Sequence, residues 1–132
     1  VLDAASARAA TSAGARFLVS PSLHRDVIET AHRHGASVIP GACTPTEAVA
    51  AVAAGADAVK LFPASQWTPG SFRDMRGALP QIPFIPTGSI AVADAPAWIA
   101  AGAVAVGMGA KLAAGTPEES AARIKDLLAS LR

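Results

Sequence analysis

Residues 54–63 of the chain read Ala54-Gly55-Ala56-Asp57-Ala58-Val59-Lys60-Leu61-Phe62-Pro63. A glycine is followed, after three residues, by a short and nearly continuous apolar run. Glycine is favoured just beyond the last turn of a helix. Short apolar runs rich in β-branched residues are typical of strands buried in a parallel sheet. This stretch therefore predicts a helix that ends at the glycine and a strand that follows it.

The same junction recurs at three other places, which read Ala13-Gly14-Ala15, His34-Gly35-Ala36 and Ala101-Gly102-Ala103. Each is followed by its own apolar run. The four glycines are spaced by 35 − 14 = 21, 55 − 35 = 20 and 102 − 55 = 47 residues. The last interval is long enough for two units, and residues 82–88 supply the missing strand. The sequence is thus built from repeated helix–strand units.

The segments between the predicted strands have the pattern of helices. Thr44-Pro45-Thr46-Glu47 and Thr116-Pro117-Glu118-Glu119 both read as capping boxes with proline at the first helical position. Asp94 is a candidate cap for a further helix, and Phe72, Met75 and Leu79 predict another after Gly70. Apolar stripes predict two more; they contain Leu23, Val27, Ile28, Ala31 and His34, and Ala121, Ile124, Leu127, Leu128 and Leu131.

The predicted order is a first helix over residues 4–13, preceded only by Val1-Leu2, and then five βα units. Such an order implies a parallel sheet covered by helices. Both a (β/α)8 barrel and an open doubly wound sheet fit. A dinucleotide fold is disfavoured because no G-x-G-x-x-G motif follows a first strand. A barrel needs eight strands and usually about 200 residues or more, so roughly its first quarter to third would be absent. No linker divides residues 1–132, which are expected to form one domain.

The composition excludes several classes of protein. The chain is 52% hydrophobic and 16% charged, which is incompatible with a disordered or coiled-coil protein. Its net charge of +1 offers no broad basic surface for nucleic acid or membrane. No apolar run approaches about 20 residues, and the first segment has no signal-peptide pattern. The single Cys43 excludes an intrachain disulfide framework and fits a reducing compartment.

Proline and glycine recur at the carboxyl ends of the predicted strands, where parallel α/β folds place their sites. These ends read Ser20-Pro21-Ser22, Pro40-Gly41-Ala42, Phe62-Pro63-Ala64, Pro86-Thr87-Gly88-Ser89 and Gly107-Met108-Gly109-Ala110. One such end would be ordinary strand termination, but five in register favour a site for a small ligand. The glycines of the last two ends could also cradle a phosphate with backbone N–H groups.

Lys60 is a charged residue inside an apolar run, and the chain has only three lysines. Burial of an unpaired ammonium is costly and lowers its pKa, and a lowered pKa suits a lysine that forms Schiff bases. Period-2 alternation places Lys60 on the same face as Ala58 and Phe62. The alternative is a lysine on the exposed face of an edge strand, with its head in water.

Other candidates are weaker. His24, His32 and His34 lie on one predicted helix without a carboxylate to complete a metal site, so a surface helix is favoured. Glu47 is explained by its capping box, and Cys43 has no partner that would activate it. The chain contains no Ser-His-Asp arrangement and no Walker motif.

The runs at residues 17–21, 38–41, 59–64 and 86–88 resemble the ordered strand ends of 2-keto-3-deoxy-6-phosphogluconate (KDPG) aldolase. The same family includes 4-hydroxy-2-oxoglutarate (KHG) aldolase, and the resemblance extends over essentially the whole chain. It implies a (β/α)8 TIM barrel of which the first two to three strands are missing from this chain. It further implies a cytoplasmic, metal-independent class I aldolase that needs no cofactor and usually forms homotrimers.

The resemblance also assigns roles to residues. Lys60 would form the Schiff base with pyruvate or the keto acid, and Pro21, Phe62 and Thr87 would line the keto-acid site. The phosphate-binding residues would be Gly88, Ser89, Gly109 and Ala110.

The chain departs from the family pattern at three points. Thr-Gly-Gly reads Thr87-Gly88-Ser89, and a serine common in the last loop is Ala110, followed by Lys111. Lys111 could supply charge to a phosphate, or the substrate could lack phosphate. The family's acid/base glutamate and its carboxylate-binding arginine belong to strands earlier than any in this chain.

Three functions are therefore predicted. The first is cleavage of 2-dehydro-3-deoxy-6-phosphogluconate to pyruvate and glyceraldehyde 3-phosphate by a lyase of the class I, pyruvate-dependent type. The second is cleavage of 4-hydroxy-2-oxoglutarate to pyruvate and glyoxylate, or of another unphosphorylated keto acid. The third is an inactive truncated barrel that only binds a phosphate ester or oligomerises. Neither a nucleic acid nor a membrane is expected as a partner.

Overall fold

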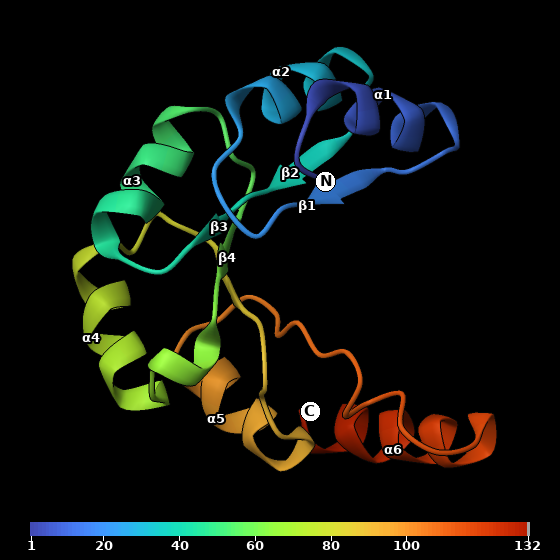
Figure 1. Ribbon diagram of the computed structural model, residues 1–132. Coiled ribbons are helices and arrows are strands. Elements are labelled where there is room, and N and C mark those ends of the chain that lie inside the picture. The colour runs from blue at the N-terminus through green and yellow to red at the C-terminus, as the bar shows by residue number, and fades with distance from the viewer. Residues whose placement is uncertain (132) are drawn as a thin grey trace.

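A computed structural model describes residues 1–131, which form an arc of strands with helices on its outer side (Figure 1). The elements are α1 (Ala4–Ser12), β1 (Phe17–Val19), α2 (Arg25–Arg33), β2 (Ser37–Ile39), β3 (Gly41–Ala42), α3 (Pro45–Ala53), β4 (Val59–Leu61), η1 (Ala64–Gln66), α4 (Pro69–Ala78), β5 (Phe84–Pro86), η2 (Val92–Asp94), α5 (Ala95–Ala100) and α6 (Pro117–Ser130). The helices lie along the convex side only. A doubly wound sheet would carry helices on both faces, so the arc is part of a (β/α) barrel.

The strands are parallel and adjacent in chain order. β1 pairs with β2, and β3, β4 and β5 pair in sequence. Only Pro40 separates β2 from β3, so these two are one extended segment. Its first half bonds to β1, and its second half, together with the Pro40 carbonyl, bonds to β4; Lys60 N–H donates to that carbonyl at 2.9 Å. Each strand is thus staggered along its neighbour, as closure of a barrel requires.

The strands expected at the two ends of the arc are not formed as full ladders. Val104 N–H donates to Phe84 C=O at 3.1 Å and Gly107 N–H to Pro86 C=O at 2.8 Å, but only a single bridge joins this segment to β5. Val1–Leu2 is likewise not a strand, although the Val1 ammonium donates to Val19 C=O at 2.9 Å. Both predictions are wrong in detail, because each segment makes too few backbone hydrogen bonds to its neighbour to form a ladder.

The predicted capping boxes of α3 and α6 are confirmed at Thr44 and Thr116. A third, at Thr68, caps α4 and was missed because its reciprocal partner is a serine rather than Glu or Gln. The prediction that Asp94 caps α5 is wrong: its side chain makes no capping hydrogen bond. The helical turn η2 leads directly into α5, so Asp94 has a helical backbone (φ −88°, ψ −14°) instead of the extended one a cap needs.

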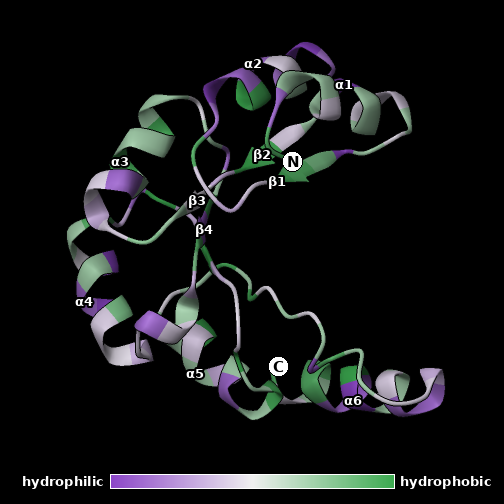
Figure 2. Ribbon diagram, viewed as in Figure 1, coloured by the Kyte–Doolittle hydropathy of each residue, from purple (hydrophilic) through white to green (hydrophobic). Residues whose placement is uncertain are grey.

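The core lies between the strands and the outer helices, in two clusters. One joins Leu18 and Val38 to α1 and α2; the other joins β4 and β5 to α3, α4 and α5. The second centres on Phe72, whose ring lies 5.8 Å from that of Phe84 and 5.6 Å from that of Trp98. Hydrophobic residues mark β1 and β2 in Figure 2. The strand residues of both clusters point toward the outer helices. The residues that alternate with them along the strands, Lys60 among them, therefore lie on the concave side.

Two predicted apolar stripes are only partly buried. On α2, Val27, Ile28 and Ala31 are buried, but His34 is exposed at the C-cap. On α6 only Leu127 is buried, and its neighbours on the same face remain in solvent. The amphipathic pattern identified both helices correctly. How much of each apolar face is buried depends on which other elements pack against it.

Candidate active site

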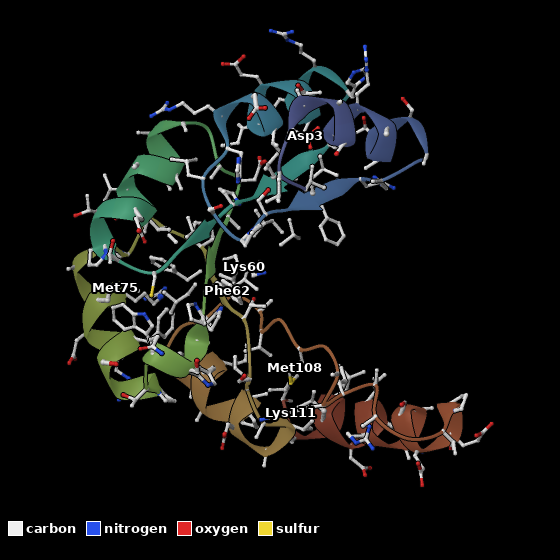
Figure 3. The ribbon with its side chains drawn as sticks, in the orientation of Figure 1. Asp3, Lys60, Phe62, Met75, Met108 and Lys111 are labelled. Carbon is white, nitrogen blue, oxygen red and sulfur yellow. The ribbon has the colours of Figure 1, made fainter. Side chains whose placement is uncertain are left out.

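The carboxyl ends of β3, β4 and β5 lie side by side, and their register fixes which side chains share the concave face. Lys60 is paired with Gly41 on one side and Ile85 on the other. In-register neighbours in a parallel sheet point to the same face. Lys60 and Phe62 therefore project from β4 into the concave side of the arc (Figure 3).

The ammonium group of Lys60 has an apolar environment. Its Nζ lies 4.3 Å from the centroid of the Phe62 ring. Within residues 1–131 it forms no ion pair, since those present join His32 to Asp57 and Arg33 to Glu29. Removal from water lowers the pKa of Lys60 below its ordinary value. The sequence-based expectation that this lysine is partly desolvated on the inner face agrees with this geometry.

Two glycines let the backbone approach Lys60 and Phe62 closely. A Cβ on Gly41 would overlap the carbonyl of Pro21, so the segment after β1 rests directly on the strand beside Lys60. Gly88 has a φ of +101°, and a Cβ there would lie 3.2 Å from the Phe62 ring. Pro21 and Phe62 line a common cavity of about 270 Å³ at the strand ends. Two of the three predicted keto-acid residues are thus brought together.

Thr87, the third predicted keto-acid residue, follows β5 and lies on the same concave face as Lys60. Its Oγ1 donates to Ile85 C=O at 3.0 Å, and a Cβ on Gly107 would overlap its side chain. Its N–H donates to Leu61 C=O at 2.9 Å, and its carbonyl accepts from Ala64 N–H at 2.8 Å. The hydroxyl is therefore held in one orientation, with its acceptor lone pairs free. It does not line the cavity shared by Pro21 and Phe62.

The two loops predicted to bind phosphate meet at one contact. The Nζ of Lys111 donates to Ser89 C=O at 3.0 Å, so the loop of Gly109 and Ala110 is joined to that of Gly88. Ser89 has a φ of +59°, so it and Gly88 are consecutive left-handed residues. Within residues 1–131, the N–H groups of Gly88, Ser89, Gly109 and Ala110 donate no hydrogen bond. Free N–H groups with a nearby ammonium suit an anion.

Asp57, the carboxylate nearest to Lys60 in sequence, is used elsewhere. It accepts from Val38 N–H at 2.7 Å and contacts His32 Nε2 at 2.9 Å. Burial raises the pKa of Asp57, but these hydrogen bonds outweigh that effect and lower it overall. The contact joins α2, β2 and the turn before β4, at the amino-terminal ends of the strands. Sequence separation hid this pairing, and it explains one of the three histidines structurally.

Within residues 1–131, no three His, Cys, Asp or Glu side chains gather as a metal site would require. None of the helices among those residues is long and apolar enough to span a bilayer.

Glu47 takes part in the capping box of α3: the N–H groups of Cys43 and Thr44 donate to its carboxylate at 2.6 and 3.0 Å. The hydrogen bond from Cys43 is the main reason that the pKa of Glu47 is lowered.

Comparison with known proteins places these residues in context. Residues 1–127 match the family described as "Aldolase: KDPG and KHG aldolase". The 2-dehydro-3-deoxy-6-phosphogalactonate aldolase of Escherichia coli is 36% identical over 100 residues, covering 75% of this chain and 49% of that protein. The chain spans about half the length of the curated relatives it matches.

Solved structures agree in fold. A 4-hydroxy-2-oxoglutarate/2-dehydro-3-deoxyphosphogluconate aldolase from TTHB1 is 36% identical with a TM-score of 0.90, covering 98% of this chain and 66% of that one. The KDPG aldolase of Legionella pneumophila, with pyruvate captured as a covalent carbinolamine, is 25% identical with a TM-score of 0.76. In that pair, 99% of this chain and 63% of that one are covered.

Proposed function

The chain belongs to the KDPG and KHG aldolase family, and from this premise we propose that Lys60 forms a Schiff base with a 2-keto acid in a class I aldolase. The observation that supports this most directly is the lowered pKa of a lysine on the concave face, beside the ring of Phe62. The Legionella relative was captured with pyruvate as a covalent carbinolamine, the species that precedes a Schiff base when an amine attacks a ketone.

The chemistry follows from an amine that is neutral more often than an ordinary lysine. The Nζ lone pair attacks the C2 carbonyl to give a carbinolamine, which loses water to become an iminium ion. The C3–C4 bond then breaks, its electrons move into the iminium group, and the C4 hydroxyl loses its proton to a base. An aldehyde leaves, and the remaining enamine takes a proton and is hydrolysed to pyruvate and free Lys60.

Phe62 and Pro21 would pack against the pyruvate portion, and Thr87 would orient it through its free lone pairs. The N–H groups of Gly88, Ser89, Gly109 and Ala110 would hold a phosphate at the other end of the substrate. Lys111, now bonded to Ser89 C=O, is near enough to these loops to add charge. We therefore favour 2-dehydro-3-deoxy-6-phosphogluconate as substrate, with pyruvate and glyceraldehyde 3-phosphate as products.

Two other substrates have specific support. Curated relatives are named for 6-phosphogalactonate as well as phosphogluconate compounds. The solved relative from TTHB1 is named for 4-hydroxy-2-oxoglutarate too, which has no phosphate. Ratios of kcat/KM for the three compounds would decide among them. A preference above about tenfold for either phosphorylated compound, equal to about 1.4 kcal/mol, would exclude the unphosphorylated substrate as the natural one.

Trapping with borohydride tests the Schiff base itself. Incubation with pyruvate and reduction should add one pyruvate-derived group, and peptide mapping should place it on Lys60. Lys60→Ala should abolish the adduct while the circular dichroism spectrum stays unchanged, and Lys125→Ala should label normally. An adduct on Lys111 or Lys125, or none at all, would refute the assignment.

Trapping also separates imine formation from complete turnover, because the described residues place no carboxylate beside Lys60. An adduct without aldehyde release would indicate a chain that binds keto acid and does not cleave it. The absence of an adduct together with phosphate binding would favour the inactive barrel.

The proposal extends to assembly and compartment. Phe17 and Val19 leave an apolar surface on the inner face of β1, which pairs on one side only. Open strand edges and apolar faces of this kind are commonly covered by another chain. We propose that a second copy of this chain covers this edge. Separately, we propose that the protein forms the homotrimers expected from the family and that it works in the cytoplasm.

A further inference from the structure

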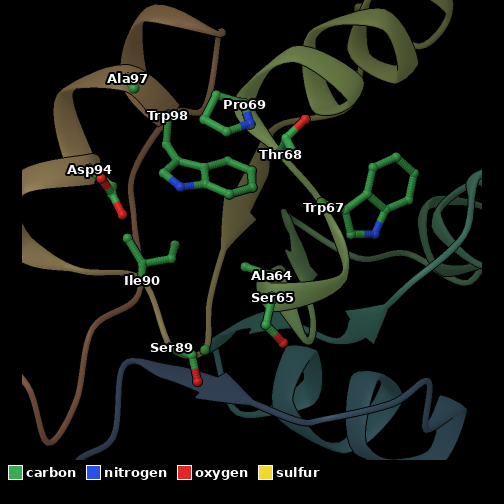
Figure 4. Close-up of a pocket in the computed structure, with 11 residues that line it drawn as sticks. Ala64, Ser65, Trp67, Thr68, Pro69, Ser89, Ile90, Asp94, Ala97 and Trp98 are labelled. Carbon is green, nitrogen blue, oxygen red and sulfur yellow. The ribbon is translucent and has the colours of Figure 1, made fainter.

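A second cavity, of about 330 Å³, opens between α4 and α5 on the outer side of the Gly88–Ser89 turn (Figure 4). Neither Lys60 nor Phe62 lines it, but Gly88 and Ser89 do, so it borders the loop proposed to bind phosphate. A water molecule takes about 30 Å³, and small-molecule pockets begin near 300 Å³. The cavity is therefore large enough for a small organic ligand.

The wall of this cavity contains an indole N–H without a protein partner. Trp98 is only 4% exposed, and its Nε1 donates to no atom among residues 1–131. No fully buried side-chain polar atom in that range lacks a partner, so Nε1 must be reached from the cavity. Figure 4 shows it directed toward the space between Asp94 and Ile90. The indole N–H is therefore open to the cavity and free to donate to a ligand oxygen there.

The polar groups of the cavity define what the ligand must offer. Asp94 lines the same space, and its side chain makes no capping hydrogen bond. A group that accepts from Trp98 and donates to Asp94 is a hydroxyl. The hydroxyls of Ser65 and Ser89 line another part of the cavity and can bond to further hydroxyls.

Charge and shape narrow the choice further. No Lys, Arg or His among residues 1–131 lines the cavity, and Asp94 adds a negative charge, so a phosphate or carboxylate is disfavoured at the end where Asp94 and Trp98 lie. The rings of Trp67 and Trp98 and the side chain of Ile90 supply flat apolar walls, which suit the C–H faces of a carbon chain bearing hydroxyls. We propose that this cavity binds a small neutral polyol, with one hydroxyl between Trp98 Nε1 and the Asp94 carboxylate.

The two tryptophans of the chain provide a direct measurement. Nitrogen-15 spectra should show two indole N–H signals, and Trp98→Phe identifies them. Addition of xylitol should shift the Trp98 signal saturably, with a dissociation constant in the millimolar range. The Trp67 signal should move much less, because its Nε1 already donates to Cys43 C=O at 3.1 Å.

Asp94→Ala should weaken xylitol binding about tenfold, since it removes the charged acceptor. Asp74→Ala is the matched control, because Asp74 is exposed on α4 and does not line the cavity. Borohydride trapping of pyruvate should be unchanged in both variants, which separates this site from Lys60. The proposal is overturned if xylitol gives no saturable shift of Trp98, if both variants bind equally, or if inorganic phosphate shifts Trp98 in place of xylitol.

Discussion

The Nζ of Lys60 is subject to two opposing influences. Withdrawal from water favours the neutral amine, whereas the Phe62 ring, 4.3 Å away, favours the ammonium through its quadrupole. A cation–π contact at a partly exposed site contributes about 0.5–1 kcal/mol. Desolvation lowers the pKa of Lys60, and the ring acts against that shift. The reactivity proposed for this lysine thus depends on which groups are absent from its surroundings as much as on those present.

The pH dependence of trapping should reflect this balance. A lowered pKa means that the neutral, nucleophilic amine appears at lower pH than for free lysine, whose pKa is about 10.4. The rate of pyruvate trapping should therefore rise with pH and level off below that value. Phe62→Leu removes the ring and should move the midpoint to still lower pH. A midpoint at or above that of free lysine would contradict the desolvated environment.

Two features of position 88 require a glycine, namely its positive φ and the closeness of the Phe62 ring. An alanine there would hold a left-handed φ of +101° and bring a Cβ to 3.2 Å from the Phe62 ring. We expect Gly88→Ala to lower the free energy of unfolding by about 1–2 kcal/mol and to slow trapping at Lys60. Urea denaturation measures the first effect and borohydride labelling the second.

Gly77→Ala is the matched control for this substitution. Gly77 lies within α4, and a Cβ there would meet nothing within 4 Å. That variant should be neutral or stabilised by up to about 1 kcal/mol, because alanine favours the helix. Equal destabilisation of the two variants would show that the positive φ of Gly88 has no special importance.

The βα units are held together at their amino-terminal ends by Asp57. Its carboxylate joins the β2 backbone at Val38 to His32 on α2, in the turn that leads into β4. This contact fixes where β4 starts, and therefore how far Lys60 lies from the opposite ends of the strands. A residue distant from the proposed chemistry thus contributes to positioning it.

Acid should weaken the contacts that the Asp57 carboxylate makes with Val38 and His32. The pKa of Asp57 is lower in the folded protein than in the unfolded chain, so its stabilisation is present above about pH 3.9 and is lost as pH falls through the folded-state value. Asp57→Asn should cost about 1 kcal/mol at neutral pH and make stability less dependent on acid. Urea denaturation at several pH values tests this, with Asp74→Asn as a control whose carboxylate makes no hydrogen bond within residues 1–131. An unchanged acid dependence in Asp57→Asn would exclude the role.

The arc as a whole leaves its concave side uncovered. Phe17, 61% exposed, and Val19 lie on β1, opposite the face on which Leu18 is buried. They form the apolar inner edge that we propose a second copy covers. The convex helices instead meet water.

Sedimentation velocity tests this proposal. We expect the protein to form a species larger than a monomer, and the double variant Phe17→Ser with Val19→Ser to sediment as a monomer. Val49→Ser with Val52→Ser, on the outer helix α3, is the matched control and should leave the assembly intact. A monomeric parent protein at micromolar concentration would contradict the proposal.

The sequence predicted the order of helices and strands well, because each boundary depends on local chemistry. The capping boxes at Thr44 and Thr116 and the glycines after α1, α2 and α3 are read from neighbouring residues alone. The partly desolvated Lys60 was also anticipated, since alternation along one strand fixes its face. The features that were not predicted depend on contacts between residues far apart in the chain. The burial of α6, the pairing of Asp57 with His32 and the contact of Lys111 with Ser89 join segments that no local pattern connects.

Because the strands pair in chain order, the molecule can be assembled in the direction in which it is synthesised. Paired strand residues are separated by 37 − 17 = 20, 60 − 41 = 19 and 85 − 60 = 25 positions. Closing such short loops costs little entropy, and contacts close in sequence favour rapid folding. Each βα unit that leaves the ribosome would find the preceding strand already in place as a template. The strand that bears Lys60 would then be positioned before the loops of Gly88 and Gly109 have been translated.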